Sequence, residues 1–215
     1  MGASVSAGFG GTPFGDAFTA AAKSPAAVES VANTFLFRDP IGESTKQVDR
    51  ALELRATTVI AIDYLFWDIY GSTDRGWRDE ALARGLANLE RVRASGAWVV
   101  VGDVPWIVTA AEFMIPRSQV PDEETLARYN EQIAAWAKQD RVLFVPFAAW
   151  AAPLATNGVV EIAPGERVEA KALVASDGLH TNALGTWFLL DKLDHFIESK
   201  LPGTPVDALI FARPK

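Results

Sequence analysis

The sequence predicts a mixed α/β fold, a three-layer α/β/α sandwich in which helices cover both faces of a mostly parallel sheet. Three short apolar runs are typical of strands buried on both faces, and the clearest of them is Thr57–Ile62, which is rich in β-branched residues. The other two runs are Trp98–Val101 and Val142–Val145. Segments with helical periodicity separate the three runs, and this alternation of strands and helices favours a parallel sheet.

The remaining segments are assigned from apolar spacing and from capping residues. We expect an amphipathic helix after Gly42, with Ser44 or Thr45 as its N-cap. Four further helices are expected over residues 13–22, 78–93, 122–138 and 183–200. A short strand is expected at Val28–Val31, a hairpin at 159–169, and an extended proline-containing strap at 201–215.

Composition limits the classes of protein that need consideration. The 215 residues, 49% hydrophobic and 22% charged, suit a single domain over residues 1–215 with its own core. A net charge of −7 argues against a nucleic acid or an anionic membrane as partner. The absence of cysteine excludes disulfides and thiolate metal sites. No apolar run is long enough to span a bilayer and no signal peptide is visible, so the compartment stays open.

Two stretches at opposite ends of the chain carry the candidate chemistry. His180 is one of only two histidines, and it follows Asp177 by three positions in a loop-like segment. An aspartate at this distance can orient an imidazole and stabilise its protonated form. Near the start, Ser4 lies between small residues in the glycine-rich stretch 2–8, and Ser6 in the same turn is the alternative nucleophile. Together the two stretches supply a nucleophile, a base and an orienting carboxylate.

These stretches resemble the conserved blocks of the SGNH (GDSL-type) serine hydrolases. The family's first block reads Gly-Asp-Ser-x-x-x-Gly, and here Gly2, Ser4 and Gly8 match it while Ala3 replaces the aspartate. Its last block, Asp-x-x-His, matches Asp177 and His180. The resemblance follows the chain order over nearly its whole length. It implies a flavodoxin-like α/β architecture and a catalytic triad of Ser4, His180 and Asp177.

The resemblance also implies an oxyanion hole formed by Ser4, Gly42 and Asp63. Gly42 takes the place of the family's second block, a lone glycine before a helix. Asp63 follows the strand 57–62, where the third block places a neutral asparagine. We expect Asp63 either to be protonated and to donate a hydrogen bond, or to turn towards a backbone N–H. In the second case the Ser4 and Gly42 amides would form the oxyanion hole alone.

Aromatic residues in or beside the expected site loops are candidates for substrate binding. They are Phe66, Trp67 and Trp106, with Phe35 and Phe37 nearby, and filling the core is an equally good interpretation of them. The expected substrate is a small-molecule ester, either a small or medium acyl ester or an acyl group on a carbohydrate, with no cofactor and no metal. The alternative is a catalytically impaired relative that binds ligands on the same face. The sequence leaves the particular ester and the oligomeric state open.

One departure from the family concerns the sheet. SGNH hydrolases have a strand that leads into the nucleophilic serine, whereas Ser4 is only three residues from Met1. We therefore expect the core to lack the partner strand that would carry Ser4, which leaves backbone groups unpaired along neighbouring strands. Either a neighbouring chain or another segment covers that gap, or the fold is only marginally stable.

Overall fold

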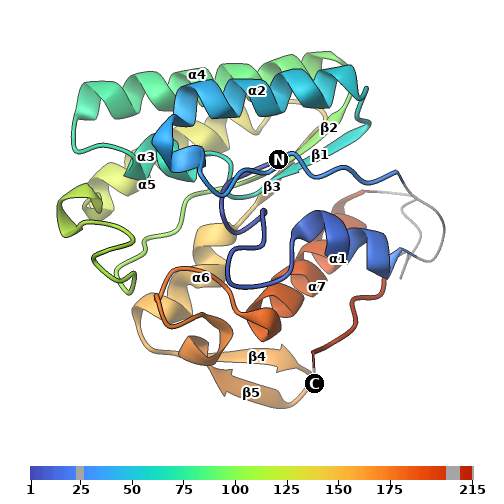
Figure 1. The fold of residues 1–215 in the computed structure, drawn as a ribbon, viewed down its shortest axis with the longest axis vertical. Helices are drawn as coiled ribbons and strands as arrows, with labels where there is room; N and C mark the ends of the chain where they lie inside the picture. Colours follow the sequence, from blue (N-terminus) through green and yellow to red (C-terminus); the bar gives the residue numbers. More distant parts are fainter. Residues whose placement is uncertain (23–26, 202–208, 215) are drawn as a thin grey trace.

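Three parallel strands form the central sheet of the computed structural model, which describes residues 1–22, 27–201 and 209–214 (Figure 1). They are β1 (Thr58–Ala61), β2 (Trp98–Gly102) and β3 (Val142–Val145), in the order β1-β2-β3. Val59 of β1 is in register with Val99, and Val99 is in register with Val142. All three strands coincide with predicted apolar runs, and the predicted α/β class is confirmed.

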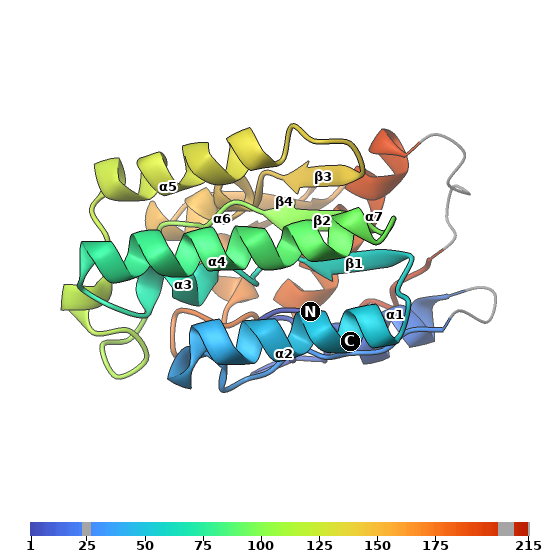
Figure 2. The same ribbon diagram turned by 90° about the horizontal axis from the view of Figure 1, so that it is seen from above.

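Each face of the sheet contributes to a separate hydrophobic core, because successive side chains of a strand point to opposite faces. Val59, Val99 and Val101 pack on one face in a core that also contains residues of α2, α4 and α5. Val100 and Val145 pack on the other face with residues of α1 and α7. Figures 1 and 2 show these helices as layers on either side of the sheet. The result is a three-layer α/β/α arrangement.

The helices on the first face are α2 (Pro40–Glu53), α4 (Arg75–Ala94) and α5 (Glu123–Trp136). Those on the second face are α1 (Phe14–Ala21) and α7 (Ala183–Lys200). Two helices that the sequence did not predict, α3 (Phe66–Tyr70) and α6 (Phe147–Ala155), follow β1 and β3. Short 3₁₀ turns occupy Leu36–Arg38, Arg117–Gln119 and Ala170–Leu173. No helix in the described part of the chain is long and apolar enough to cross a membrane.

The predicted hairpin is present as β4 (Val159–Ala163) and β5 (Glu166–Glu169), which pair antiparallel. Two other predictions were wrong. Residues 28–31 form no strand. Helix α2 begins at Pro40 rather than after Gly42, because Asp39 is its N-cap and proline suits the first helical position.

The outer edge of β1 pairs with no strand among the described residues. The Met1 nitrogen reaches this edge and donates to the Ile60 carbonyl at 2.9 Å. Beyond this contact lies a cavity of about 540 Å³, bounded by β1, by Phe14 and Phe18 of α1, and by residues 27–32. Among the described residues this edge of β1 therefore lacks a partner strand, and residues 27–32 flank it without forming one.

Part of the predicted C-terminal strap can be followed. Leu209 forms an isolated antiparallel bridge with Ala22, and the Phe211 carbonyl accepts a hydrogen bond from the Trp187 indole at 3.0 Å. The chain therefore returns across α1 and α7. The rest of this prediction, residues 202–208 and Lys215, lies outside the described residues.

Candidate active site

The segment before α1 winds into a tight turn that presents Ser4. The Ala7 N–H donates to the Ala3 carbonyl at 3.0 Å, and the Phe9 N–H donates to the Ser4 carbonyl at 2.9 Å. Gly8 adopts a φ of +82°, and a Cβ atom there would lie 2.3 Å from the Pro13 nitrogen. Glycine is therefore required at this point, where the turn bends back towards α1.

A buried glutamine anchors the beginning of this turn to helix α2. Gln47 accepts a hydrogen bond from the Gly2 N–H at 2.7 Å and donates to the Gly2 carbonyl at 2.9 Å. Gln47 is buried, so both bonds are shielded from water. Gly2 itself has a φ of +141°, and a Cβ atom there would lie 2.0 Å from Asp63 Oδ1. The turn is thus fixed to α2 on one side and to the end of β1 on the other.

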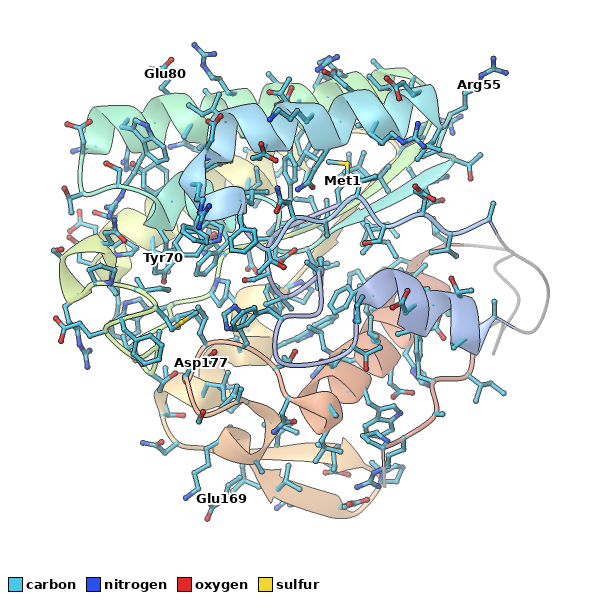
Figure 3. The ribbon with its side chains drawn as sticks, in the orientation of Figure 1. Met1, Arg55, Tyr70, Glu80, Glu169 and Asp177 are labelled. Atoms are coloured by element: carbon cyan, nitrogen blue, oxygen red, sulfur yellow. The ribbon has the colours of Figure 1, made fainter. Side chains whose placement is uncertain are left out.

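The loop before α7 positions the histidine. Asp177, labelled in Figure 3, lies in this loop. Its Oδ1 accepts hydrogen bonds from the Leu179 N–H at 2.9 Å and the His180 N–H at 3.0 Å, so the loop folds tightly around the carboxylate. The Ala175 N–H donates to the His180 carbonyl at 2.7 Å. Gly178 adopts a φ of +67° in this loop, and its carbonyl accepts a hydrogen bond from the Thr109 hydroxyl at 2.9 Å. The loop is therefore held both by its own bonds and by the segment after β2.

The structure brings Ser4, His180 and Asp177 together in one hydrogen-bonded chain. His180 Nδ1 lies 2.7 Å from Asp177 Oδ2, and His180 Nε2 lies 2.7 Å from Ser4 Oγ. With Nδ1–H donating to the carboxylate, Nε2 is free to accept the hydroxyl proton of Ser4. The His180 side chain is buried, with the Phe9 ring centroid 4.5 Å from the imidazole centroid.

The charge on Asp177 suits this arrangement. Burial alone would raise the pKa of Asp177, but hydrogen bonds from the His180 backbone and side chain and from the Leu179 N–H lower it overall. The carboxylate is therefore ionised at neutral pH and faces the imidazole at 2.7 Å. An anion in this position stabilises the imidazolium that forms when the histidine takes a proton.

Asp63 does not have the role that the sequence suggested for an oxyanion residue. Its Oδ2 accepts hydrogen bonds from the Val5 and Ser6 N–H groups, each at 3.1 Å, and its Oδ1 accepts from the Ser6 hydroxyl at 2.6 Å. All three contacts use Asp63 as an acceptor, so the expectation that it donates to an oxyanion is wrong. Of the two alternatives, the structure shows the carboxylate turned to backbone N–H groups. They belong to the turn over residues 3–9 that contains the candidate nucleophile Ser4, here called the nucleophile turn.

Gly42 was also assigned wrongly to the oxyanion hole. It lies in the first turn of α2, where its N–H donates to the side chain of the N-cap, Asp39, at 3.0 Å. That amide is therefore already used for capping. Of the three predicted donors only the Ser4 N–H remains, since it has no hydrogen-bond partner among the described residues.

A small cavity lies beside Ser4, at the carboxyl ends of all three strands. Its volume is about 40 Å³. Phe66 lines this cavity, a position that is compatible with the predicted role of Phe66 in substrate binding. Trp67 and Trp106 do not line it. Trp67 is buried against Phe66 and Phe37, with ring centroids 5.2 and 5.6 Å away, and Trp106 is 36% exposed. Trp67 is therefore a core residue, which is the second of the two interpretations that the sequence left open.

Gln47, Ile107 and Leu179 were not singled out from the sequence. Gln47 holds the nucleophile turn, and Ile107 and Leu179 line the cavity. A buried polar residue on the apolar side of an amphipathic helix could have indicated Gln47, which is adjacent to Val48. Ile107 carries no comparable local signal. Ser6, the alternative nucleophile, donates to Asp63 and so helps to hold the turn. No cluster of three or more His, Asp or Glu side chains within the described ranges could hold a metal ion.

Comparison with known proteins gives no match: no family model, no curated protein and no solved structure corresponds to the chain. Any assignment of function therefore depends on the geometry around Ser4, His180 and Asp177.

Proposed function

We propose that this protein is a serine hydrolase of the SGNH type that cleaves carboxylic esters. The observation that supports the proposal is the continuous chain from Asp177 through His180 to Ser4, with both contacts at 2.7 Å. Nucleophile and base within hydrogen-bond reach, with the base oriented by a third group, are the signature of an activated hydroxyl. The substrate class is a small or medium acyl ester, or an acyl group carried by a carbohydrate.

The first half of the reaction transfers the acyl group to the protein. Ser4 Oγ attacks the ester carbonyl carbon while its proton passes to His180 Nε2, and the carbonyl electrons move onto oxygen. When the tetrahedral intermediate collapses, the bond to the alcohol oxygen breaks and His180 returns the proton to that oxygen. The alcohol leaves, and an acyl ester of Ser4 remains. Asp177 stays ionised throughout and stabilises the imidazolium.

In the second half, water takes the place of the alcohol. His180 Nε2 accepts a proton from the water as its oxygen attacks the acyl carbon. Collapse of the second intermediate breaks the bond to Ser4 Oγ, which regains its proton from His180. The carboxylic acid is released and the protein returns to its starting state.

The site offers few groups that could stabilise the negative charge on the tetrahedral intermediate. Apart from Ser4 itself, the walls of the adjacent cavity contain no side chain with an N–H or O–H donor; they are Ala3, Val5, Asp63, Phe66, Pro105, Ile107, Phe147 and Leu179. Backbone N–H groups must then bind the oxyanion, and the Ser4 N–H, which has no hydrogen-bond partner among the described residues, is the candidate donor. A single oxyanion donor is worth ~2.7–4 kcal/mol, so we expect slow turnover compared with a site that has three.

The small number of oxyanion donors also favours the alternative function, that of a relative that binds ligands without hydrolysing them. A fluorophosphonate probe separates the two. If the protein is a hydrolase, the probe forms one adduct, located by mass spectrometry on the peptide containing Ser4. Ser4→Ala should abolish labelling, and His180→Ala should slow it strongly because the hydroxyl loses its base.

Ser6 provides the matched control, because its hydroxyl lies in the same turn but points to Asp63. Ser6→Ala should still label on Ser4. An adduct on Ser6, or labelling that survives Ser4→Ala, would contradict the assignment of the nucleophile. A folded wild-type protein that does not label at all would support the ligand-binding alternative.

A further inference from the structure

The cavity beside Ser4 is narrow and almost entirely apolar. Besides Ser4 and Asp63, its walls come from Ala3, Val5, Phe66, Pro105, Ile107, Phe147 and Leu179. Both carboxylate oxygens of Asp63 are already hydrogen-bonded to the nucleophile turn. The cavity therefore offers apolar contact to whatever group is attached to the carbon that Ser4 attacks.

Its size sets a limit on that group. One water molecule requires ~10–15 Å³ of such volume. The cavity, at about 40 Å³, has room for only a few atoms. An acetyl group has three non-hydrogen atoms, whereas a butyryl group has five. An acetyl group is therefore the better match in size, and a longer chain has to extend past these walls or displace them.

Tyr70, which is labelled in Figure 3, holds the walls in place. Its hydroxyl donates to the Pro105 carbonyl at 2.9 Å and accepts from the Ile107 N–H at 3.0 Å. Its ring stacks on Phe66, with centroids 4.4 Å apart and planes within 5°. Phe66 and Ile107 are 8% and 6% exposed. Three residues of the cavity wall, Phe66, Pro105 and Ile107, are thus tied to one fully buried tyrosine, and closely packed walls of this kind deform little.

We propose that this cavity is the acyl-binding site of the enzyme and that it selects acetyl esters over esters of longer acids. The inference depends on the proposed hydrolase function and specifies its substrate class. Phe66 and Ile107 are then specificity-determining residues, with Tyr70 as the positioning residue behind them. A methylene that a pocket cannot accommodate costs about 10–200-fold in kcat/KM, so a butyryl group with two more methylenes should be strongly disfavoured.

The test compares p-nitrophenyl acetate, butyrate and octanoate as substrates of the wild-type protein. Ser4→Ala provides the blank, because it removes enzymatic but not spontaneous hydrolysis. We expect kcat/KM for the acetate to exceed that for the butyrate at least tenfold, with the octanoate lower still. Equal or higher kcat/KM for the butyrate or octanoate would overturn the size selection while leaving the hydrolase function intact. Failure to turn over any ester, together with no fluorophosphonate adduct, would overturn the hydrolase function and the inference with it.

Enlarging the cavity gives a second, internal test. Ile107→Ala removes three carbons from the wall and should raise the ratio of butyrate to acetate kcat/KM at least fivefold. Because both substrates are measured on one sample, the ratio does not depend on how much of the variant is folded. Ile133→Ala is the matched control, since Ile133 is fully buried in α5 and does not line the cavity. A similar change of ratio in Ile133→Ala, or none in Ile107→Ala, would contradict the assignment.

Discussion

The carboxylate of Asp63 accepts a hydrogen bond from the Ser6 hydroxyl at 2.6 Å, and this contact joins the end of β1 to the nucleophile turn. The same carboxylate accepts hydrogen bonds from the N–H groups of Val5 and Ser6. Three hydrogen bonds from a turn to one buried side chain leave that turn little freedom. Asp63 therefore determines where Ser4 Oγ lies relative to His180, without contacting His180 itself.

Asp63→Ala should lower kcat by tenfold or more, because the nucleophile turn loses all three bonds and Ser4 is no longer fixed. Each N–H that is left buried and unpaired costs ~1–3 kcal/mol, so the melting temperature should fall as well. Asp63→Asn should behave differently. Its carbonyl oxygen can accept from the two N–H groups and its amide can donate to the Ser6 hydroxyl, while a negative charge near the developing oxyanion is removed. Activity near neutral pH should be kept or increased.

Asp103→Ala is the control for general damage at a strand end. Asp103 follows β2, and its Oδ1 accepts from the Ala148 N–H at 2.6 Å, away from the nucleophile turn. This variant should lose stability with less than a tenfold loss of kcat. A tenfold loss in a folded Asp63→Asn protein would show that the charge itself is needed.

The three residues of the candidate triad should act as a unit. Ser4→Ala and His180→Ala should each remove nearly all hydrolysis of p-nitrophenyl acetate, and the double variant should be little worse than either one. Asp177→Ala should cost less, because water can partly replace the carboxylate that orients the imidazole. Steady-state kinetics of the four variants check this. Losses that multiply in the double variant would mean that Ser4 and His180 do not share one step.

The main elements of the fold could be predicted because their signals are local. The β-branched run that contains β1 and the helical periodicity of α5 each lie within one segment. The pairing of Asp177 with His180 was also accessible, since a spacing of three residues in a loop already places the two side chains near each other. Ser4 could be added from its glycine-rich setting.

The remaining features of the site depend on contacts between distant segments. Asp63 is separated by 57 and 58 residues from the N–H groups that it accepts, and no local pattern records that pairing. Gly42 was misassigned because Asp39, three residues earlier, caps the helix and takes up its amide. The cavity beside Ser4 needs the loops after all three strands, so its size could only come from the folded chain.

Gly178 should be sensitive to substitution for reasons beyond its backbone conformation. It adopts a φ of +67°, and a Cβ atom there would lie 2.1 Å from the Thr109 carbonyl oxygen. Gly178→Ala should therefore displace the loop that carries Asp177, lowering kcat at least tenfold. Gly165 in the β4–β5 turn has a φ of +75° but nothing within 4 Å of its Cβ position. Gly165→Ala should cost only the conformational strain, ~1–2 kcal/mol of stability, with kcat unchanged. Equal kcat in the two variants would exclude the proposed clash.

Asp68 has the most unusual environment of the ionisable groups in α3. It is 1% exposed, and neither carboxylate oxygen has a hydrogen-bond partner among the described residues. Helix α4 makes room for it at Gly85, where a Cβ atom would lie 2.3 Å from Asp68 Oδ2. Burial raises the pKa of Asp68 well above its ordinary value, because the charged form would lose its hydration. The folded protein therefore keeps a proton on Asp68 that the unfolded chain releases.

This difference makes stability depend on pH in a defined direction. Below pH ~4 the carboxyl is protonated in both states and contributes no pH dependence. Above that pH the unfolded chain loses the proton while the folded chain keeps it, so the free energy of unfolding falls by up to ~1.4 kcal/mol per pH unit until the raised pKa is reached. Asp68→Asn carries no such proton. The free energy of unfolding of Asp68→Asn, minus that of the wild type, should therefore rise from pH 4 to pH 7, as measured by urea unfolding at each pH. Glu131→Gln, at an exposed position in α5, serves as the control variant. A difference between Asp68→Asn and the wild type that stays constant over this range would mean that Asp68 ionises normally in the folded protein.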